Sequence, residues 1–394
     1  MPAGTDLIAR SGDLKQQLVA FSRRPRYRSA FRRATKQRFG STVIRGDEED
    51  VVNFVDAFVL QHKLSDGRTV VDHFVDARSD LTNAERDMLL GWHDVVEGIF
   101  EVQRRDGHAI VTVNLIDELT YRVYSNMGPS VFAQMPPGSF AIARLVPVGD
   151  AWVLSGATHV QPASERATMY RIAADAALRH PAKVFRNPDK LARSWELQRR
   201  HRESFIEFFG ADLVVLSGSQ LADRMDSFTE YHSRKAAVAA GRTVWSTPQW
   251  DLPAPLREAD TVAVIYDETD GLNFCADFGL VEGAFADPER NADSEHGRAV
   301  LGYLDDDSIS PLPFRRLAQR HPTGASRLFQ KLLLRPGFSW EHDGEALLRE
   351  HKPAYFTTPA FPSTISLSEA LSRHIRPDRR SRPAPRRMNP TVRT

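Results

Sequence analysis

The sequence predicts a multi-domain α+β protein: a small five-stranded β-barrel of the OB or SH3-like kind flanked by helices, and a second, mostly helical α/β region. Three observations lead to this prediction. The 394 residues suffice for two or three domains. Apolar residues recur at helical spacing before about residue 99 and after about 163, and with a period of two between them. Finally, both ends of the chain are basic and its middle is acidic.

The charge distribution sets the outer boundaries. Residues 1–45 hold eleven Lys and Arg against two acids, a net charge of +9, and residues 373–394 hold eight Arg against one Asp, a net charge of +7. Because the whole chain carries only +1, the remainder carries −15. We interpret residues 1–45 as a basic N-terminal arm and residues 371–394, which are rich in Pro and Arg, as a basic disordered tail.

Helices are expected on both sides of the arm's end. Pro25 suits the first position of a helix, which needs no amide hydrogen. The acidic run 47–50 opens an amphipathic helix, the most apolar stretch of the chain, which carries Asp56 in its middle. Thr82 and Glu85 form a capping box at the start of a later helix.

Five short β-rich runs follow, and turn-forming residues separate them. Five strands within about sixty residues fit a small closed barrel. Residues 46–163 are therefore predicted as one domain of helices plus barrel. The expected strands cover residues 99–104, 108–116, 119–125, 139–146 and 151–160.

Three further segments are predicted after the barrel. Residues 164–240 have the pattern of a helix–strand–helix unit, with a buried strand at 213–216. Residues 241–259 contain Pro248, Pro253 and Pro255 and are interpreted as a linker. Residues 260–370 form an α+β C-terminal domain that begins with a strand near Thr261.

Patterns typical of cofactor and metal sites are weak, so we expect no cofactor and no metal. Cys275 is the single cysteine, which excludes an intramolecular disulfide and a cysteine-built zinc site. The segment Ser217–Ser219 has too few glycines for a nucleotide loop. His342 and His351 lie nine residues apart and do not share a helix face as zinc ligands. Asp305, Asp306 and Asp307 are adjacent and point in different directions, which favours a solvated loop.

The chain is expected to be cytoplasmic and to have no membrane partner. Asp6 and Asp13 interrupt the region in which a leader peptide would be apolar. No run of eighteen apolar residues occurs.

The basic ends carry the main functional prediction. Arginines neutralise phosphates, and interleaved aromatic rings stack on exposed bases. Two alternatives stay open: the arms dock on the acidic body of their own chain or of a partner copy. A membrane-surface helix is less favoured because Ala30 and Ala34 give its apolar face little bulk. The predicted nucleic-acid-binding residues are Arg23, Arg24, Arg26, Tyr27, Arg28, Phe31, Arg32, Arg33, Lys36, Arg38, Arg379, Arg380, Arg382, Arg386 and Arg387.

From about Asp50 onward the chain resembles a family of uncharacterised bacterial proteins. The segments that carry the resemblance are Leu115–Tyr121, Ala143–Asp150 and Asp306–Phe314. Some related proteins carry an added SEC-C motif, a short cysteine-rich zinc knuckle. With Cys275 alone, this chain departs from that pattern, and the resemblance implies no activity and no functional residue.

The first functional hypothesis is therefore a binding protein, not an enzyme, that contacts nucleic acid or a ribonucleoprotein through its basic arms and β-barrel. The alternative is a protein–protein adaptor or self-associating scaffold. A second alternative is a metal-dependent hydrolase or nuclease centred on Asp305, Asp306 and Asp307.

Overall fold

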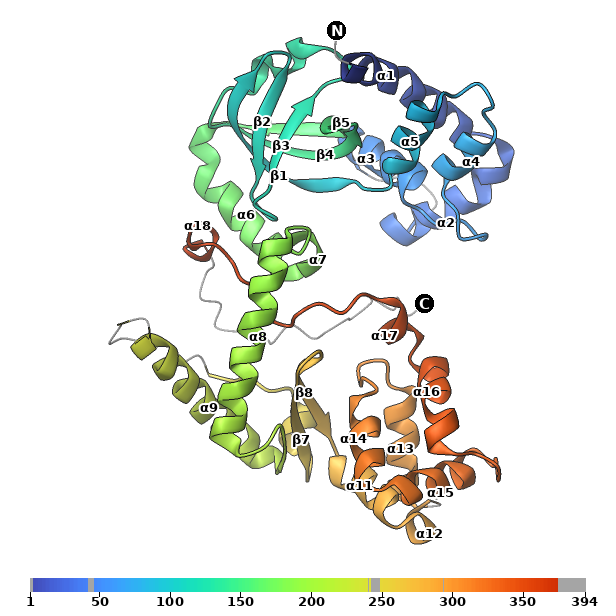
Figure 1. Ribbon diagram of the computed structural model, residues 1–394, viewed down its shortest axis with the longest axis vertical. Coiled ribbons are helices and arrows are strands. Elements are labelled where there is room, and N and C mark those ends of the chain that lie inside the picture. The colour runs from blue at the N-terminus through green and yellow to red at the C-terminus, as the bar shows by residue number, and fades with distance from the viewer. Residues whose placement is uncertain (1–2, 42–45, 240, 242–248, 293, 375–394) are drawn as a thin grey trace. The chain divides into compact units, whose positions relative to one another are not determined.

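The computed structural model describes residues 3–41, 46–239, 241, 249–292 and 294–374, and these residues form two compact units (Figure 1). Unit 1 comprises the described residues of Met1–Asn187 and Leu367–Ile375, and unit 2 those of Pro188–Ser366. Each unit contains its own sheet and its own buried apolar clusters. The predicted α+β class is confirmed.

Unit 1 combines helices with a five-stranded sheet. Its helices are α1 (Ala3–Ser22), α2 (Arg28–Phe39), α3 (Glu48–Leu60), α4 (Val70–Asp76), α5 (Asn83–Gly91), α6 (Arg166–Arg179), α7 (Pro181–Val184) and α18 (Glu369–Ser372), with 3-10 turns η1 (Pro25–Tyr27), η2 (Pro129–Gln134) and η3 (Ala163–Glu165). Its strands are β1 (Val96–Asp106), β2 (Ala109–Asn114), β3 (Thr120–Tyr124), β4 (Phe140–Val148) and β5 (Ala151–Gln161).

The five strands close into a ring in the order β1-β2-β3-β5-β4, and β4 pairs back onto β1. All neighbours are antiparallel except β3 and β5. Register shifts in β1 at Val102/Arg104 and in β4 at Ile142/Arg144 bend the strands, as bulges do. Gly98 is required where it lies, because an added Cβ would meet the Asn114 side chain at 2.3 Å. The five predicted strands all occur, with ends shifted by a few residues.

Helices α1 to α5 pack around a second core in unit 1. Leu14, Leu18 and Phe21 from the N-terminal segment lie in one buried cluster with Phe58 of α3. The capping feature expected from the sequence, that of α5, is present, and α3 has a cap as well. Asp47 caps α3 by accepting from Asp50 N at 2.9 Å, and Thr82 and Glu85 form the capping box of α5. The N-terminal segment therefore contributes core side chains as well as positive charge.

Unit 2 is mostly helical and has a three-stranded sheet. Its helices are α8 (Pro188–Phe209), α9 (Gly218–Ala239), α10 (Ala254–Glu258), α11 (Phe278–Ala286), α12 (Pro288–Asn291), α13 (Glu295–Asp305), α14 (Leu312–Arg320), α15 (Pro322–Leu332), α16 (Trp340–His351) and α17 (Pro353–Thr357). Its strands are β6 (Leu213–Leu216), β7 (Val262–Asp267) and β8 (Gly271–Ala276), paired antiparallel in that order.

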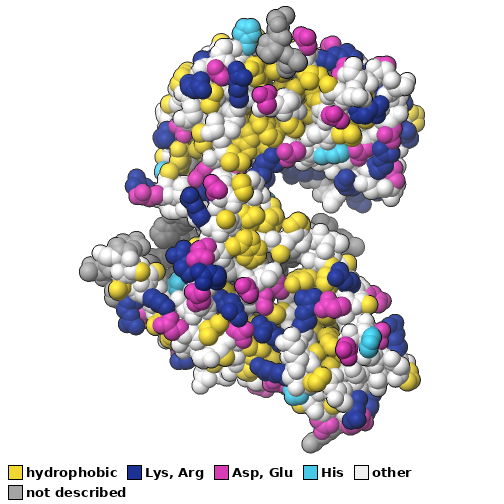
Figure 2. Space-filling model, viewed as in Figure 1, with side chains coloured by type: hydrophobic (Ala, Val, Ile, Leu, Met, Phe, Trp, Pro, Cys, Tyr) yellow, Lys and Arg dark blue, Asp and Glu magenta, His cyan; other side chains and the backbone are white. Residues whose placement is uncertain are grey.

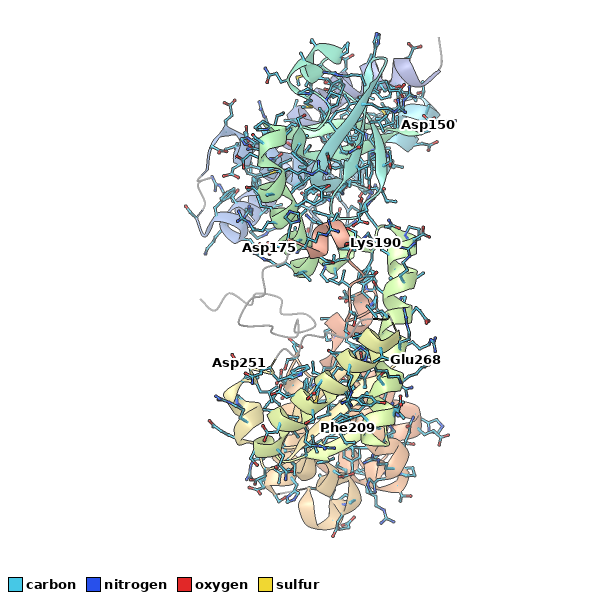
Figure 3. All side chains as sticks on the ribbon, turned by 90° about the vertical axis from the view of Figure 1, so that its left-hand side faces the viewer. Asp150, Asp175, Lys190, Phe209, Asp251 and Glu268 are labelled. Atoms are coloured by element: carbon cyan, nitrogen blue, oxygen red, sulfur yellow. The ribbon has the colours of Figure 1, made fainter. Side chains whose placement is uncertain are left out.

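Both faces of this sheet are buried. Ala263 and Ile265 enter a cluster with α11 and the helices after it, whereas Val262 and Val264 enter a cluster with α8 and α9. Figure 3 labels Lys190 near the start of α8 and Phe209 at its end. Midway along α8, Gln198 is 0% exposed and donates to the carbonyl of Glu268 at 2.7 Å. The α8 helix thereby holds the turn between β7 and β8.

Two sequence predictions for unit 2 need comment. The predicted linker 241–259 lies partly outside the described residues, and its described part contributes Leu252 to a buried cluster. Asp305 ends α13, and Asp306 and Asp307 occupy the loop before α14. The buried Lys352 ammonium donates to the carbonyls of Tyr303, at 2.8 Å, and Asp306. A cation at the C-terminus of a helix is favoured by the helix dipole.

A search of the described ranges for a helix with the length and apolar character of a membrane span finds none.

Candidate nucleic-acid interface

The predicted interface forms a continuous helical surface from η1 to α2. Pro25 begins the 3-10 turn that leads into α2, and Gly40, with φ of 66°, ends α2 in the left-handed conformation that glycine tolerates. Ala30 and Ala34 lie on the buried side of α2. Small side chains there let the helix pack closely against the rest of unit 1, so its basic residues face outward.

We define the basic surface as the eight cationic side chains between residues 23 and 38, two of which precede η1 and six of which lie in η1 and α2. All eight are exposed. In the part of the chain that the structure describes, none of them lies within 4.0 Å of a carboxylate. The basic surface consists of Arg23, Arg24, Arg26, Arg28, Arg32, Arg33, Lys36 and Arg38.

The two cations of α1 behave differently. In α1, Arg10 Nε contacts Glu85 Oε1 at 2.6 Å and Lys15 Nζ contacts Asp56 Oδ1 at 2.5 Å. Figure 2 shows Lys and Arg side chains interspersed with Asp and Glu over the face in view. The charge of α1 is therefore used inside unit 1, whereas the charge of the basic surface is available to a partner.

Aromatic rings orient part of the basic surface. The Arg24 guanidinium lies 4.2 Å from the centre of the Phe21 ring, and Arg26 lies 4.6 Å from that of Tyr27. Arg38 lies 5.6 Å from the ring of Phe39. Such cation–π contacts restrict guanidinium groups without neutralising them. A polyanion would thus meet cations that have already lost part of their rotational freedom.

The two predicted aromatic contacts are placed inside unit 1. Tyr27 is 2% exposed, and its hydroxyl lies 3.2 Å from Nδ1 of His73. Phe31 is partly buried, with ring centres 5.3 Å from Phe54 and 5.0 Å from Phe58. These rings anchor η1 and α2 to α3 and α4 and do not form a stacking platform. The predicted residues Arg379, Arg380, Arg382, Arg386 and Arg387 lie outside the described residues.

The pKa of His62, which follows the C-terminus of α3, responds to the positive charge of the basic surface. Its ring stacks on Phe58 at 5.2 Å, and its pKa is lowered by burial and by the charge of Arg33. Replacing Arg33 with Gln is expected to raise the pKa of His62, because the repulsion of the protonated ring is removed. An NMR titration of the His62 ring signals measures this. An unchanged pKa would show that the guanidinium does not act on His62, and Arg179→Gln serves as the distant control.

A buried ion cluster joins α1 and α3 to the ring. Asp56 is 3% exposed and accepts from Ser155 Oγ at 2.7 Å and from Arg144 Nε at 2.8 Å, in addition to its contact with Lys15. Arg144 also contacts Glu97. Burial opposes the charged form of Asp56, but Lys15 and Arg144 outweigh it, so the pKa of Asp56 is lowered. The cluster fixes α1 and α3 to the ring, and α3 in turn packs against Phe31 of α2.

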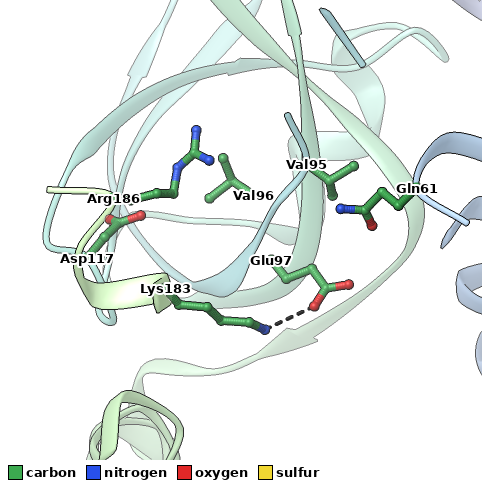
Figure 4. A pocket seen from close by; sticks show the side chains of 7 residues that line it. All are labelled: Gln61, Val95, Val96, Glu97, Asp117, Lys183 and Arg186. Carbon is green, nitrogen blue, oxygen red and sulfur yellow. Dashed lines mark hydrogen bonds and ion pairs between the residues drawn. The ribbon is translucent and has the colours of Figure 1, made fainter. Parts of the chain in front are cut away.

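A cavity of about 140 Å³ lies beside β1 at the edge of the ring (Figure 4). Lys183 Nζ contacts Glu97 Oε2 at 2.9 Å, and Arg186 contacts Asp94 at 2.5 Å. Asp117, whose pKa is raised by burial, accepts from Tyr121 OH at 2.7 Å. Each charged group that lines the cavity thus already has an ion-pair or hydrogen-bond partner. The lining residues are Gln61, Val95, Val96, Glu97, Asp117, Lys183 and Arg186.

The residues considered for catalysis or metal binding do not converge. Among the described residues, no group of three or more His, Cys, Asp or Glu side chains is placed to hold a metal ion. Asp305 contacts His351 Nδ1 at 3.2 Å, and Asp306 accepts from Ser308 N in its own loop. Cys275 is buried, and burial raises the pKa of its thiol to about 12, so it is not a thiolate at neutral pH.

A histidine pair in unit 2 was not anticipated from the sequence. His201 on α8 and His232 on α9 have ring centres 4.2 Å apart. Burial, His232 and Arg200 together lower the pKa of His201 to about 4. The neutral ring therefore packs between two helices.

This pair predicts acid sensitivity of unit 2. Because the pKa of His201 is lower in the folded state than in the unfolded one, its contribution is fully present above the unfolded pKa of about 6.5 and is lost as pH falls toward 4. We expect the free energy of unfolding of unit 2 to drop by about 2 kcal/mol between pH 7 and pH 5 from this residue alone. Denaturant unfolding of the wild type and of His201→Gln at both pH values measures this contribution of His201 to the free energy of unfolding. Identical pH dependence in the two proteins would contradict the prediction.

Compared with protein-family models, with curated proteins and with solved structures, the chain matches none of them. The resemblance to a bacterial family therefore stays a prediction, and the functional argument rests on geometry and charge.

Proposed function

We propose that this protein is a non-enzymatic binding protein that contacts nucleic acid through the basic surface. The observation that carries the proposal is the set of eight exposed cations with no carboxylate within 4.0 Å in the described chain. Eight clustered positive charges repel one another and are stabilised by a polyanion. Nucleic acid supplies regularly spaced phosphates and releases counterions when Lys and Arg replace them.

Docking of the basic surface on the protein's own acidic body receives less support. Several carboxylates of unit 1 are paired with other cations, as in Arg78–Asp80 and Arg186–Asp94. The N-terminal cations that do reach body carboxylates are Arg10 and Lys15 of α1. An acidic segment of another protein is the competing partner for the same surface.

The ring supports the proposal by analogy of fold. Its strand order, with β3 parallel to β5, is that of OB-type barrels, which often bind oligonucleotides. Across its first three strands, Arg104 pairs with Val111 and Val111 with Arg122. Both arginines are exposed and share one carboxylate, Asp106, at 3.8 and 2.8 Å. Arg104, Arg122 and Asp106 together therefore carry a net charge of +1.

The test is the salt dependence of binding by the full chain. Fluorescence anisotropy with a labelled nucleic acid of mixed sequence gives the affinity at several salt concentrations between about 0.05 and 0.2 M. If all eight cations contact phosphates, log affinity falls against log salt with a slope of about −7, and four contacts give about −3.6. Absence of binding at the lowest salt, or tighter binding to a polyglutamate chain of equal length, would overturn the proposal.

A further inference from the structure

The basic surface offers exposed cations to a partner, whereas the aromatic rings beside them are buried or half-buried and pack against other rings of unit 1. Tyr27 is buried with its hydroxyl against His73, and Phe31 packs on Phe54 and Phe58. Phe39 lies against Phe54 at 5.3 Å, and Arg38 covers its ring. Proteins that bind single strands combine a basic groove with aromatic rings on which the bases stack. The second of these components is missing from the described part of the basic surface.

The arrangement of the cations matches a dense row of phosphates. Arg28, Arg32 and Lys36 follow one another at intervals of four residues, which places them about 6 Å apart along one side of α2. The helix and its preceding turn together span about 24 Å. A duplex carries one negative charge per about 1.7 Å of its axis, so this length holds about fourteen phosphates, of which about half face one side. About seven phosphates on one side of a duplex thus lie along the length that carries the six cations of η1 and α2. Each contact also releases more counterions from a duplex than from a single strand, with salt slopes of about −0.9 and about −0.7 per contact.

We propose, on the basis of the function proposed above, that the basic surface binds double-helical nucleic acid through its phosphates and does not read the bases. Arg24 and Arg26, which the rings of Phe21 and Tyr27 orient, add two cations before the start of α2. Phosphate contacts position a protein on a duplex and carry no direct sequence information. Binding is therefore expected to be independent of sequence and strongly dependent on salt.

The experiment compares nucleic acids at one salt concentration with the full chain. The panel contains three duplexes of unrelated sequence and about 20 base pairs, as DNA and as RNA, the corresponding single strands, and an abasic single strand of equal length. Duplexes are expected to bind at least about fivefold more tightly than single strands, with less than about threefold variation among sequences. Abasic and ordinary single strands are expected to bind alike, because no ring stacks on the bases.

Equal or tighter binding of ordinary single strands than of duplexes would overturn this inference, as would a preference of about tenfold or more for one duplex sequence. Those outcomes leave nucleic-acid binding itself intact. The function proposed above fails in a different way, namely when no nucleic acid of the panel binds. A triple variant tests whether the basic surface makes the contact. Combining Arg28→Gln, Arg32→Gln and Lys36→Gln must weaken duplex binding. Unchanged duplex binding by this variant places the contact elsewhere and overturns the inference too.

Discussion

Replacing Asp56 with Asn is expected to lower the free energy of unfolding of unit 1 by about 3–5 kcal/mol. The amide has nearly the same shape but no charge, so Lys15 and Arg144 lose their shared buried counterion. Lys15 is largely buried, and its pKa is already lowered by desolvation, an effect that Asp56 opposes. Removing one partner of a buried ion pair is strongly destabilising because a buried charge is left uncompensated.

Denaturant unfolding followed by a probe in unit 1 measures the effect, with Asp87→Asn on the exposed side of α5 as the matched control. Adding Lys15→Met to Asp56→Asn is expected to restore part of the lost stability, because one of the unpaired cations is removed. A loss below about 1 kcal/mol for Asp56→Asn would contradict the account of the cluster.

The contribution of Asp56 to the free energy of unfolding should also disappear in acid. The lowered pKa of Asp56 means that its stabilisation is present above the unfolded pKa of about 3.9 and is lost as pH falls further.

Neutralising Arg28, Arg32 and Lys36 together with Gln is expected to weaken nucleic-acid binding about 100-fold, at about 1 kcal/mol per lost contact. The slope of log affinity against log salt should become shallower by about 2.7. Gln has a helix propensity similar to that of Arg and Lys, so α2 should be retained. Because none of the three has a carboxylate partner in the described chain, stability should be nearly unaffected or should rise through reduced repulsion.

The matched control removes the same number of charges elsewhere. Arg179, Arg199 and Arg200 are exposed, and each contacts a carboxylate of its own helix. Their replacement with Gln changes the net charge equally but leaves the basic surface intact. Equal loss of affinity in both triple variants would show that net charge alone governs binding and that the placement of the cations in α2 is irrelevant.

Much of the secondary structure was predictable because its causes are local. The period-two pattern between residues 99 and 160 and the turns that interrupt it located all five strands of the ring. Thr82 with Glu85 marked the start of α5 through a capping box whose two hydrogen bonds lie within one turn. Such features depend on residues three or four positions apart, so they are visible in the sequence.

The buried cluster was not predicted, although one signal for it existed. Asp56 stands in the most apolar stretch of the chain, where an unpaired carboxylate would be costly. Its partners Lys15, Arg144 and Ser155 are up to 99 residues away in the sequence, so only folding brings them together. The pair His201 and His232 was missed for the same reason, since its members lie on different helices.

The sequence by itself determined the α+β class, the five strands of the ring and the concentration of positive charge near the N-terminus, because composition and periodicity are properties of the chain. The tertiary structure decided which of these charges face solvent. It pairs Arg10 and Lys15 with carboxylates and leaves the eight cations of the basic surface without one in the described chain. It also decided that Tyr27 and Phe31 serve as anchors and not as stacking surfaces. The sequence shows only that an aromatic ring lies between basic residues, and such a ring can either face a partner or pack against α3 and α4. Burial of its apolar area favours the packed position.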